Sequence, residues 1–581
     1  MPLLIKPDEK NRNGVLSGAL NAAVFDAVRD MPGRRRWVDR MLVFELTRAN
    51  VDFLKAKFPD AVWEGTRVAE LETLERLEAD ARAAKRAPLP KEAFKFAFKT
   101  EPRPHQVTAF NVSRDREAYG LFLEQGLGKT KVILDTAAHL WSNGKINTLL
   151  IIAPNGVHAQ WVTDQMPVHM PDFVPHKALI YRSAQTKQWT AHAEDVLAYD
   201  DGLRIIAMHQ EALATKKGES FLHRALHSGR ALWVIDESDS IKSAGAERTK
   251  VALRYRGSAP YRRILTGTPV SNGIEDLFTQ LKWLDDDVHG FSSFYTFRNR
   301  YCVTQPVPGA PRGVVKIVGY QNVDELKHRM DAWTLRLTAA DCLGLPERVY
   351  MEHPVQMTEE QKRTYAELRD EMLTQLSNGT IISAEQAVVK ILRLQQVLCG
   401  HIGDEDKNVH SIPTNRADEA LSVAEQSHDK VMIWARFHHD IDLLVRTFQE
   451  ADAKADRQDK PGPRWNPVVW DGRTTIDDRI ANKRTFMEDP NCRAFIGNPS
   501  AAGRGLDGMQ HASHTMIYYS NSFKAVDRWQ SEARLFRDGQ KGTVKVIDLV
   551  VPKSIDGYIL KALKAKKDIA RVALDVKLED I

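Results

Sequence analysis

Short apolar runs alternate with helical stretches through most of the chain. Between residues 100 and 290, four apolar runs end in polar or glycine residues: TLLIIAP, LRIIAM, ALWVIDE and RRILTGTP. Runs of this kind, separated by helical patterns, are typical of buried strands in a parallel sheet. Residues 416–575 repeat the pattern with DKVMIWARF, CRAFIGNP, HTMIYYSN and VKVIDLVV. We therefore expect an α/β chain with two parallel-sheet lobes.

Other segments flank or separate these lobes. Residues 37–63 predict a strand followed by an amphipathic helix, and residues 66–86 follow a helical period with charges outside. The prolines of residues 86–94 indicate a linker, and residues 290–415 are mainly helical in pattern, with a Pro/Gly-rich loop at 306–313. The predicted domains are a small N-terminal α+β accessory module (1–95), a first lobe (96–289), a helical insertion (290–415) and a second lobe (416–575).

Composition changes this picture little. The chain has 581 residues and a net charge of +5, which does not by itself establish nucleic-acid binding. Its four cysteines lie far apart without a CxxC pair, so we expect neither a zinc site nor a disulfide framework, and a reducing, cytoplasmic location. No apolar run approaches the ~20 residues of a membrane helix, and no secretory signal is evident. We therefore expect no association with a membrane.

The sequence LFLEQGLGKT combines the end of a strand with the start of a helix. Gly126 and Gly128 would let the backbone curl around an anion, which the helix N-terminus would then hold. Lys129 would reach the β- and γ-phosphates of ATP, and Thr130 would place its hydroxyl on Mg²⁺. Because Leu123 stands where the general phosphate-loop pattern has glycine, a chance match stays open at this point.

A pair of carboxylates ends the apolar run ALWVIDESD. Carboxylates just beyond a strand lie where open α/β sheets bind ligands. Asp236 would hold Mg²⁺ through its water shell, and Glu237 would act on the attacking water as general base. A solvated acidic turn is the alternative, but the position of the pair, after the GKT loop and on a separate strand, favours catalysis.

In their order, these motifs resemble helicase superfamily 2, and within it the Swi/Snf-related remodeller-type DNA translocases, over residues 100–555. Glu124–Thr130 is close to the family's E-x-G-L-G-K-T form, whose members commonly lack the first glycine. Arg103-Pro-His-Gln106 resembles the adenine-recognition element, and LTGTP (265–269) resembles the coupling motif. A last motif, Q-x-x-x-R-x-x-R followed by GQK, completes the series.

The resemblance implies two RecA-like lobes with the ATP site between them, and ATP and Mg²⁺ as cofactors. Arg534 and Arg537 would act as arginine fingers on the γ-phosphate, although their spacing also suits surface ion pairs on one helix face. The implied catalytic residues are Lys129, Asp236, Glu237, Arg534 and Arg537. The implied nucleotide contacts are Arg103, Gln106, Glu124, Gly126, Leu127, Gly128, Lys129, Thr130, Gly505, Asp507 and Gln530, with Thr130 and Asp236 at the metal.

Double-stranded DNA is the partner that the resemblance implies, with single-stranded DNA or RNA as alternatives, and protein partners are not predicted. Such motors hold the phosphates, which carry no sequence information. The candidate contacts are Asn155, Gln160 and Trp161 in the first lobe and Thr474, Arg504 and Lys524 in the second. Trp161 is equally the kind of residue that fills a core. Residues 502–507 resemble the family's G-x-G-L-N element but depart from it by carrying Arg504 and Asp507.

Three functions stay open. The first is a duplex-DNA translocase that remodels DNA or protein–DNA complexes, the second a strand-separating helicase on DNA or RNA, and the third a non-catalytic nucleic-acid-binding scaffold. The last motif and the insertion at 290–415 favour the first function, and no strand-splitting hairpin is recognised in the sequence. Residues 47–63 resemble a segment ahead of the motor in annealing-helicase (HARP-like) relatives, with a structural lid on the first lobe as the alternative.

Overall fold

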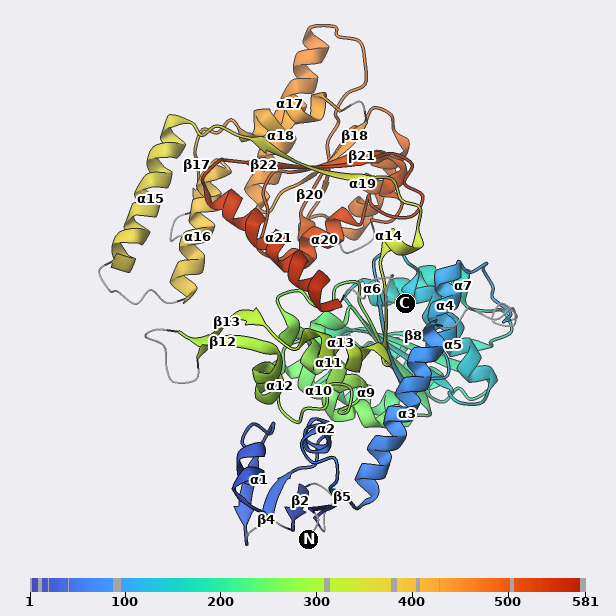
Figure 1. Ribbon diagram of the computed structural model, residues 1–581. Coiled ribbons are helices and arrows are strands. Elements are labelled where there is room, and N and C mark those ends of the chain that lie inside the picture. Colours follow the sequence, from blue (N-terminus) through green and yellow to red (C-terminus); the bar gives the residue numbers. More distant parts are fainter. Residues whose placement is uncertain are drawn as a thin grey trace. The chain divides into compact units, whose positions relative to one another are not determined.

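The computed structural model divides into two compact units between Thr338 and Ala339, and Figure 1 traces both. Among the described helices, none is long and apolar enough to cross a membrane. The residues described are 3–8, 13–18, 20–39, 41–86, 96–307, 314–377, 384–403, 408–427, 429–501 and 506–574.

The first lobe is built on a parallel sheet with the strand order β14-β6-β11-β10-β7-β9-β8. Every residue of β6, β7 and β10 is buried, so both faces of the central sheet are covered. The strands are β6 (Ala118–Leu123), β7 (Thr148–Ala153), β8 (His176–Ile180), β9 (Leu203–His209), β10 (Ala231–Asp236), β11 (Tyr261–Leu265) and β14 (Thr334–Leu337). The helices are α4 (Pro104–Ser113), α5 (Lys129–Ser142), α6 (Val157–Gln160), α7 (Met166–His169), α8 (Lys187–Leu197), α9 (Lys216–His227), α10 (Glu247–Tyr255), α11 (Leu277–Leu284), α12 (Phe294–Tyr301) and α13 (Val323–Asp331).

The second lobe has a parallel sheet of its own, with the order β15-β22-β21-β18-β20-β19. Its strands are β15 (Arg348–Pro354), β18 (Lys430–Trp434), β19 (Val468–Trp470), β20 (Ala494–Gly497), β21 (Ser513–Tyr518) and β22 (Val544–Val550), beside a small pair, β16 (His401–Gly403) and β17 (Val409–Ser411). The helices after Thr338 are α14 (Ala339–Cys342), α15 (Glu359–Ser377), α16 (Ala384–Leu398), α17 (Arg416–Glu425), α18 (His438–Arg457), α19 (Ile476–Glu488), α20 (Ala525–Glu532) and α21 (Ile555–Leu574). The prediction of two parallel-sheet lobes is confirmed.

The segment predicted as a helical insertion, residues 290–415, is divided between the two units. Its strand β14 pairs with β6 in the first sheet, and its strand β15 pairs with β22 in the second. It also contains a hairpin of β12 (Cys302–Pro306) and β13 (Val315–Tyr320), which stands away from the body of the first unit in Figure 1. These strands lack the continuous apolar runs of central strands, because each lies at an edge or in a two-stranded ribbon, and pattern reasoning therefore missed them.

The N-terminal module is a mixed sheet with the order β3-β4-β2-β1-β5 and three helices. The strand and helix predicted within residues 37–63, and the helix predicted at 66–86, are confirmed. The strands are β1 (Leu4–Pro7), β2 (Asn13–Ser17), β3 (Arg35–Val38), β4 (Met41–Glu45) and β5 (Val62–Trp63), and the helices are α1 (Ala22–Ala27), α2 (Arg48–Lys57) and α3 (Thr66–Arg86). The predicted linker lies mostly outside the described residues.

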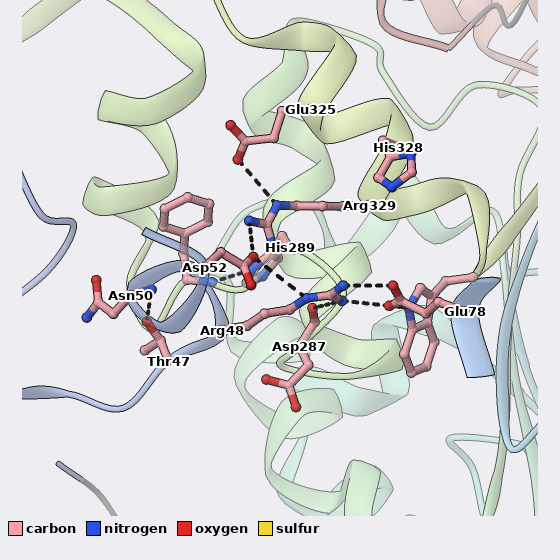
Figure 2. A network of polar contacts seen from close by, with 12 residues as sticks. Thr47, Arg48, Asn50, Asp52, Glu78, Asp287, His289, Glu325, His328 and Arg329 are labelled. Atoms are coloured by element: carbon pink, nitrogen blue, oxygen red, sulfur yellow. Dashed lines mark hydrogen bonds and ion pairs between the residues drawn. The ribbon is translucent and has the colours of Figure 1, made fainter. Parts of the chain in front are cut away.

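A network of buried and partly buried polar contacts holds this module together and joins it to the first lobe. Arg48 of α2 donates two hydrogen bonds, of 2.6 and 2.7 Å, to the carboxylate of Glu78 on α3. The indole N–H of Trp333 donates to the same carboxylate at 2.6 Å. Arg329 donates to Asp52 at 2.7 Å, as Figure 2 shows. Since Trp333 immediately precedes β14, the module is fixed to the strand that borders β6.

The charge of Glu78 is essential to this network. Burial alone would raise the pKa of Glu78, but the hydrogen bonds and positive charge of Arg48 outweigh it and lower the pKa below its usual value. A carboxyl whose pKa is lower in the folded state stabilises the fold above its unfolded-state pKa. The stabilisation is lost as the pH falls through the folded-state pKa of Glu78.

We predict that Glu78→Ala destabilises the N-terminal module by about 3–5 kcal/mol, because it leaves Arg48 buried without its carboxylate. Hydrogen exchange of the α2 and α3 amides measures this locally, which suits a chain of more than one unit. Glu70→Ala is the matched control, since Glu70 forms only an exposed pair with Arg67. Equal exchange in the two variants would contradict the proposed importance of the network.

Candidate active site

Three loops of the first lobe meet at one edge of its sheet. Parallel strands end at the same edge, and β11 lies between β6 and β10. The loop that follows β6 carries the GLGKT sequence, β10 ends in Asp236, and β11 is followed by TGTP. The strand order alone therefore places the three predicted motifs next to one another.

The glycine-rich loop has the backbone that its sequence predicts. Gly126 and Gly128 have φ values of +84° and +79°, in the left-handed region that favours glycine. A Cβ atom at Gly128 would lie 2.2 Å from Nε2 of Gln106, so a larger residue there would displace the end of this side chain. Lys129 begins α5, and its Nζ donates to the carbonyl oxygen of Leu123 at 2.9 Å. The lysine thus lies back across its own loop.

The segment at the start of α4 contacts this loop directly. Gln106 donates through Nε2 to the carbonyl oxygen of Leu127 at 3.3 Å, and its Oε1 accepts from the backbone N–H of Arg103 at 3.0 Å. His105, which sequence reasoning did not single out, lies with Nε2 3.1 Å from the same Leu127 carbonyl oxygen. The side chain of Leu127 is fully buried. The structure therefore brings together the predicted adenine-recognition segment and the glycine-rich loop.

Asp236 is buried at the end of β10, with 7% of its surface exposed. Its Oδ2 accepts from the indole N–H of Trp161 at 3.0 Å, and its Oδ1 accepts from the backbone N–H of Glu237 at 3.0 Å. Burial raises the pKa of Asp236, and the positive charge of Lys129 opposes this rise. Glu237 has a left-handed backbone with φ of +48°, a strained conformation of the kind that gathers at functional sites.

The third loop, which follows β11, joins the other two. The hydroxyl of Thr266 donates to Oε2 of Glu237 at 3.4 Å and accepts from the backbone N–H of Thr268 at 3.0 Å. Gly267 packs against the glycine-rich loop, since a Cβ atom there would lie 3.3 Å from backbone atoms of residues 123–125. Because the loops are in contact, a displacement of one of them would displace the other two.

Two glutamines that sequence reasoning missed hold the acidic motif. Gln210, after β9, donates to the backbone carbonyl oxygens of Asp236 at 2.7 Å and Glu237 at 3.3 Å. Gln280, on α11, accepts from the hydroxyl of Ser238 at 2.7 Å and donates to the Pro269 carbonyl oxygen at 2.8 Å. Gln280 lies in the segment EDLFTQLKWL, which follows the TGTP loop. For Gln210, the one available signal was its position directly after an apolar run.

The side chains at this edge fit a magnesium–triphosphate. The Asp236 carboxylate and the Thr130 hydroxyl are hard oxygen donors, which Mg²⁺ prefers. The two left-handed glycines keep side chains off the loop, and the start of α5 presents backbone N–H groups to an anion. Lys129 adds a mobile positive charge beside these groups.

In the second unit, Arg534 and Arg537 share one carboxylate. The helix α20 ends at Glu532, so both arginines lie in the turns that follow it rather than on a helix face. Arg534 donates to Oδ1 of Asp507 at 3.2 Å, and Arg537 contacts the same oxygen. Gln530 is half-buried on α20. Arg504 and Gly505 lie outside the described residues.

The predicted DNA contacts differ in their surroundings. Asn155 is exposed just after β7, Gln160 is half-buried, and Lys524 is exposed at the start of α20. Thr474 is partly buried, and its hydroxyl accepts from the backbone N–H of Asp471 at 3.2 Å. Trp161 is only 2% exposed and occupies the core, so the structure gives it a place beside Asp236 rather than on a phosphate-binding surface.

Comparisons with known proteins agree with this geometry. A family model, the SNF2-related domain, matches residues 105–403, which is just over half of the chain. The "Putative protein p41" of Acyrthosiphon pisum secondary endosymbiont phage 1 is 20% identical and covers 82% of this chain and 98% of the phage protein. The "Probable ATP-dependent DNA helicase CHR12" of Arabidopsis thaliana is 25% identical over 77% of this chain, which spans 39% of the plant protein.

A solved structure, "Sulfolobus solfataricus SWI2/SNF2 ATPase core in complex with dsDNA", is 17% identical, with a TM-score of 0.35, and covers 83% of this chain and 99% of that one. The family assignment depends on the matched domain model, which includes the glycine-rich, acidic and coupling loops. The chain belongs to the SNF2-related family of helicase-like ATPases.

Proposed function

We propose that this protein is an ATP-driven motor that moves along double-stranded DNA and remodels DNA or protein–DNA complexes. The observation that carries the proposal is that Lys129, Asp236 and Glu237 lie at the same edge of the sheet. Thr266 donates a hydrogen bond to Glu237, the proposed general base. The name of the Arabidopsis relative supports DNA as the partner, although this chain spans only part of that protein.

Hydrolysis follows from the groups at this edge. Lys129 leaves the Leu123 carbonyl oxygen for the β- and γ-phosphates of ATP, which offer it a stronger, charged acceptor. Glu237 takes the proton of the attacking water, and Thr266 fixes the direction of its carboxylate. Thr130 and Asp236 would hold a magnesium ion, which would supply positive charge to the phosphate oxygens when bound. The Trp161 indole keeps Asp236 oriented toward this role.

Arg534 and Arg537 of the second unit complete the site in this proposal. They add positive charge to the γ-phosphate, where negative charge develops during phosphoryl transfer. A nucleotide held by groups of both units favours the state in which the units are close, and hydrolysis removes that preference. Alternate binding of DNA by the two units then converts each cycle into movement.

The DNA contacts proposed for this movement are phosphate contacts. Asn155 and Gln160 would supply them from the first unit, and Thr474, Arg504 and Lys524 from the second. The exposure of Asn155 and Lys524 supports their assignment. Binding of this kind depends on salt and not on sequence. The nucleotide contacts proposed beside Lys129 and Thr130 are Arg103, Gln106, Glu124, Gly126, Leu127, Gly128, Gly505, Asp507 and Gln530.

A strand-separating helicase is the second candidate, and the β12–β13 hairpin is the observation that favours it. Its strands expose the side chains of Val303 and Val318, and Val307 and Val314, which adjoin the strands, are exposed as well. A projecting apolar ribbon is the kind of element that could enter between two strands. The resemblance of the last motif to those of duplex translocases still favours movement along an intact duplex.

We predict that Lys129→Ala lowers kcat for ATP hydrolysis at least about 100-fold, because the charge that binds the phosphates is lost. A phosphate-release assay with saturating DNA measures the effect. Lys145→Ala is the matched control, since Lys145 is an exposed lysine at the opposite, amino-terminal edge of the same sheet. Full activity of the Lys129 variant would remove this lysine from the mechanism.

We predict that Thr266→Val slows ATP hydrolysis about tenfold, the effect of removing one hydrogen bond to a charged group. Thr266→Ser keeps the hydroxyl that donates to Glu237 and should retain most of the activity. Steady-state kcat of the two purified variants decides between them. If the serine variant is as slow as the valine variant, the hydroxyl is not the group that matters.

We predict that double-stranded DNA stimulates ATP hydrolysis more than single-stranded DNA or RNA does, and that the stimulation falls as salt rises. ATPase rates with the three nucleic acids, measured at two salt concentrations, test this directly. A triplex-displacement assay beside a forked-duplex unwinding assay separates the two candidate functions. Unwinding without triplex displacement would favour the strand-separating helicase. If no nucleic acid stimulates ATP hydrolysis, both candidate functions are contradicted.

A further inference from the structure

The C-terminal part of α3 contacts the turn that leads into β14. Nζ of Lys85 donates to the carbonyl oxygens of Asp331 and Thr334 at 2.8 and 3.0 Å, and to Oδ1 of Asp331 at 2.5 Å. Two turns earlier on α3, Glu78 accepts from the indole N–H of Trp333 at 2.6 Å. The side chains of Lys85 and Asp331 are only 14% and 21% exposed. The N-terminal module therefore fixes the chain at the start of β14 through partly buried, charge-assisted hydrogen bonds.

β14 in turn contacts the start of the glycine-rich loop. It is an edge strand of the first sheet and pairs with β6. The backbone N–H of Glu124, the first residue after β6, donates to the carbonyl oxygen of Leu337 on β14 at 3.0 Å. Leu337 is also the register partner of Leu123, whose carbonyl oxygen accepts from Lys129. The end of β14 thus lies beside the residues from which the loop begins.

Backbone geometry explains why Lys85 matters for this strand. The carbonyl oxygen of Trp333 accepts from the N–H of Gly120 on β6 at 2.8 Å. Successive carbonyl groups of a strand point to opposite sides, so the carbonyl of Thr334 points away from β6. An edge strand leaves such groups without a partner in its sheet, and Lys85 binds this one. β14 is therefore held from both sides, by β6 and by α3.

We propose that Lys85 is a positioning residue for nucleotide binding. By fixing β14 beside β6, it keeps the acceptor of the Glu124 N–H in place and the glycine-rich loop ordered before ATP binds. The inference rests on the proposed function, in which this loop binds the phosphates of ATP. Ordering a loop during binding lowers affinity, whereas a loop that is already ordered avoids this cost. The N-terminal module thereby influences ATP affinity through β14.

Replacing Lys85 should therefore affect binding more than chemistry. Lys85→Met should weaken binding of a non-hydrolysable ATP analogue and of ADP about fivefold each, since part of the free energy of these hydrogen bonds is transmitted to the loop. At saturating ATP, kcat should stay close to that of the parent protein, because Lys129 and Glu237 are unchanged. Lys85→Arg, which keeps the charge and the donors, should bind both nucleotides more tightly than Lys85→Met does.

The experiment combines titration of the full chain with the ATP analogue and ADP with hydrogen exchange of the Glu124 amide, which reports on local opening. Exchange at Glu124 should be faster in Lys85→Met than in the parent protein, and exchange in the central strand β9 should be unchanged. Lys55→Met is the matched control, because Lys55 belongs to the same module but pairs with Glu72 at 3.3 Å. It should alter neither the nucleotide affinities nor the exchange at Glu124.

Several results would overturn the inference. These are unchanged nucleotide affinities in Lys85→Met, weaker binding without faster exchange at Glu124, and faster exchange throughout the first lobe, which would indicate a general loss of stability. If Lys85→Met does not fold, Asp331→Asn takes its place. It removes the carboxylate charge but leaves both carbonyl acceptors of Lys85, so the same changes should appear at smaller size, and their absence would equally overturn the inference.

Failure of the proposed function gives a different result. The parent protein would then bind neither nucleotide, whereas exchange at Glu124 would still respond to Lys85→Met, because that response depends on β14 and not on ATP.

Discussion

The candidate active site depends on one constraint, the place of β11 between β6 and β10. These strands run parallel, so the loops after them leave the sheet at the same edge. The Thr266 loop is thereby held between Lys129 and Glu237, and it contacts both neighbouring loops. A different strand order would leave every motif intact in the sequence and separate them in space.

The most demanding group within this arrangement is the buried carboxylate of Asp236. A buried charge is costly unless it is hydrogen-bonded or paired. Trp161 supplies one bond, the backbone N–H of Glu237 supplies another, and the nearby charge of Lys129 favours ionisation. Gln210 meanwhile fixes the backbone carbonyl of Asp236. The position of Trp161, which the sequence had indicated as a candidate DNA contact, is therefore best explained by its hydrogen bond to the buried carboxylate of Asp236.

Elements and motifs with a local sequence signal could be predicted, whereas edge strands and tertiary contacts could not. Central strands such as β7 and β10 are apolar at nearly every position, so the sequence predicts them, whereas β14 and β15 have one neighbour each and no such signal. The motifs around Lys129 and Glu237 are local and could be recognised. Trp161 and its hydrogen-bond partner Asp236 are 75 residues apart in the sequence. Their contact depends on tertiary packing, which no local sequence pattern encodes.

The arginines of the chain show how charge balance separates structural groups from functional ones. Arg416 is fully buried, pairs with Asp556 and donates to the Leu549 carbonyl oxygen. These hydrogen bonds are all made to groups inside the protein. Such a residue stabilises the fold and has little left for a ligand. Arg534 and Arg537 instead share the exposed carboxylate of Asp507. Two mostly covered guanidinium groups that share an exposed carboxylate are therefore the arrangement that supports the role proposed for Arg534 and Arg537 at the γ-phosphate.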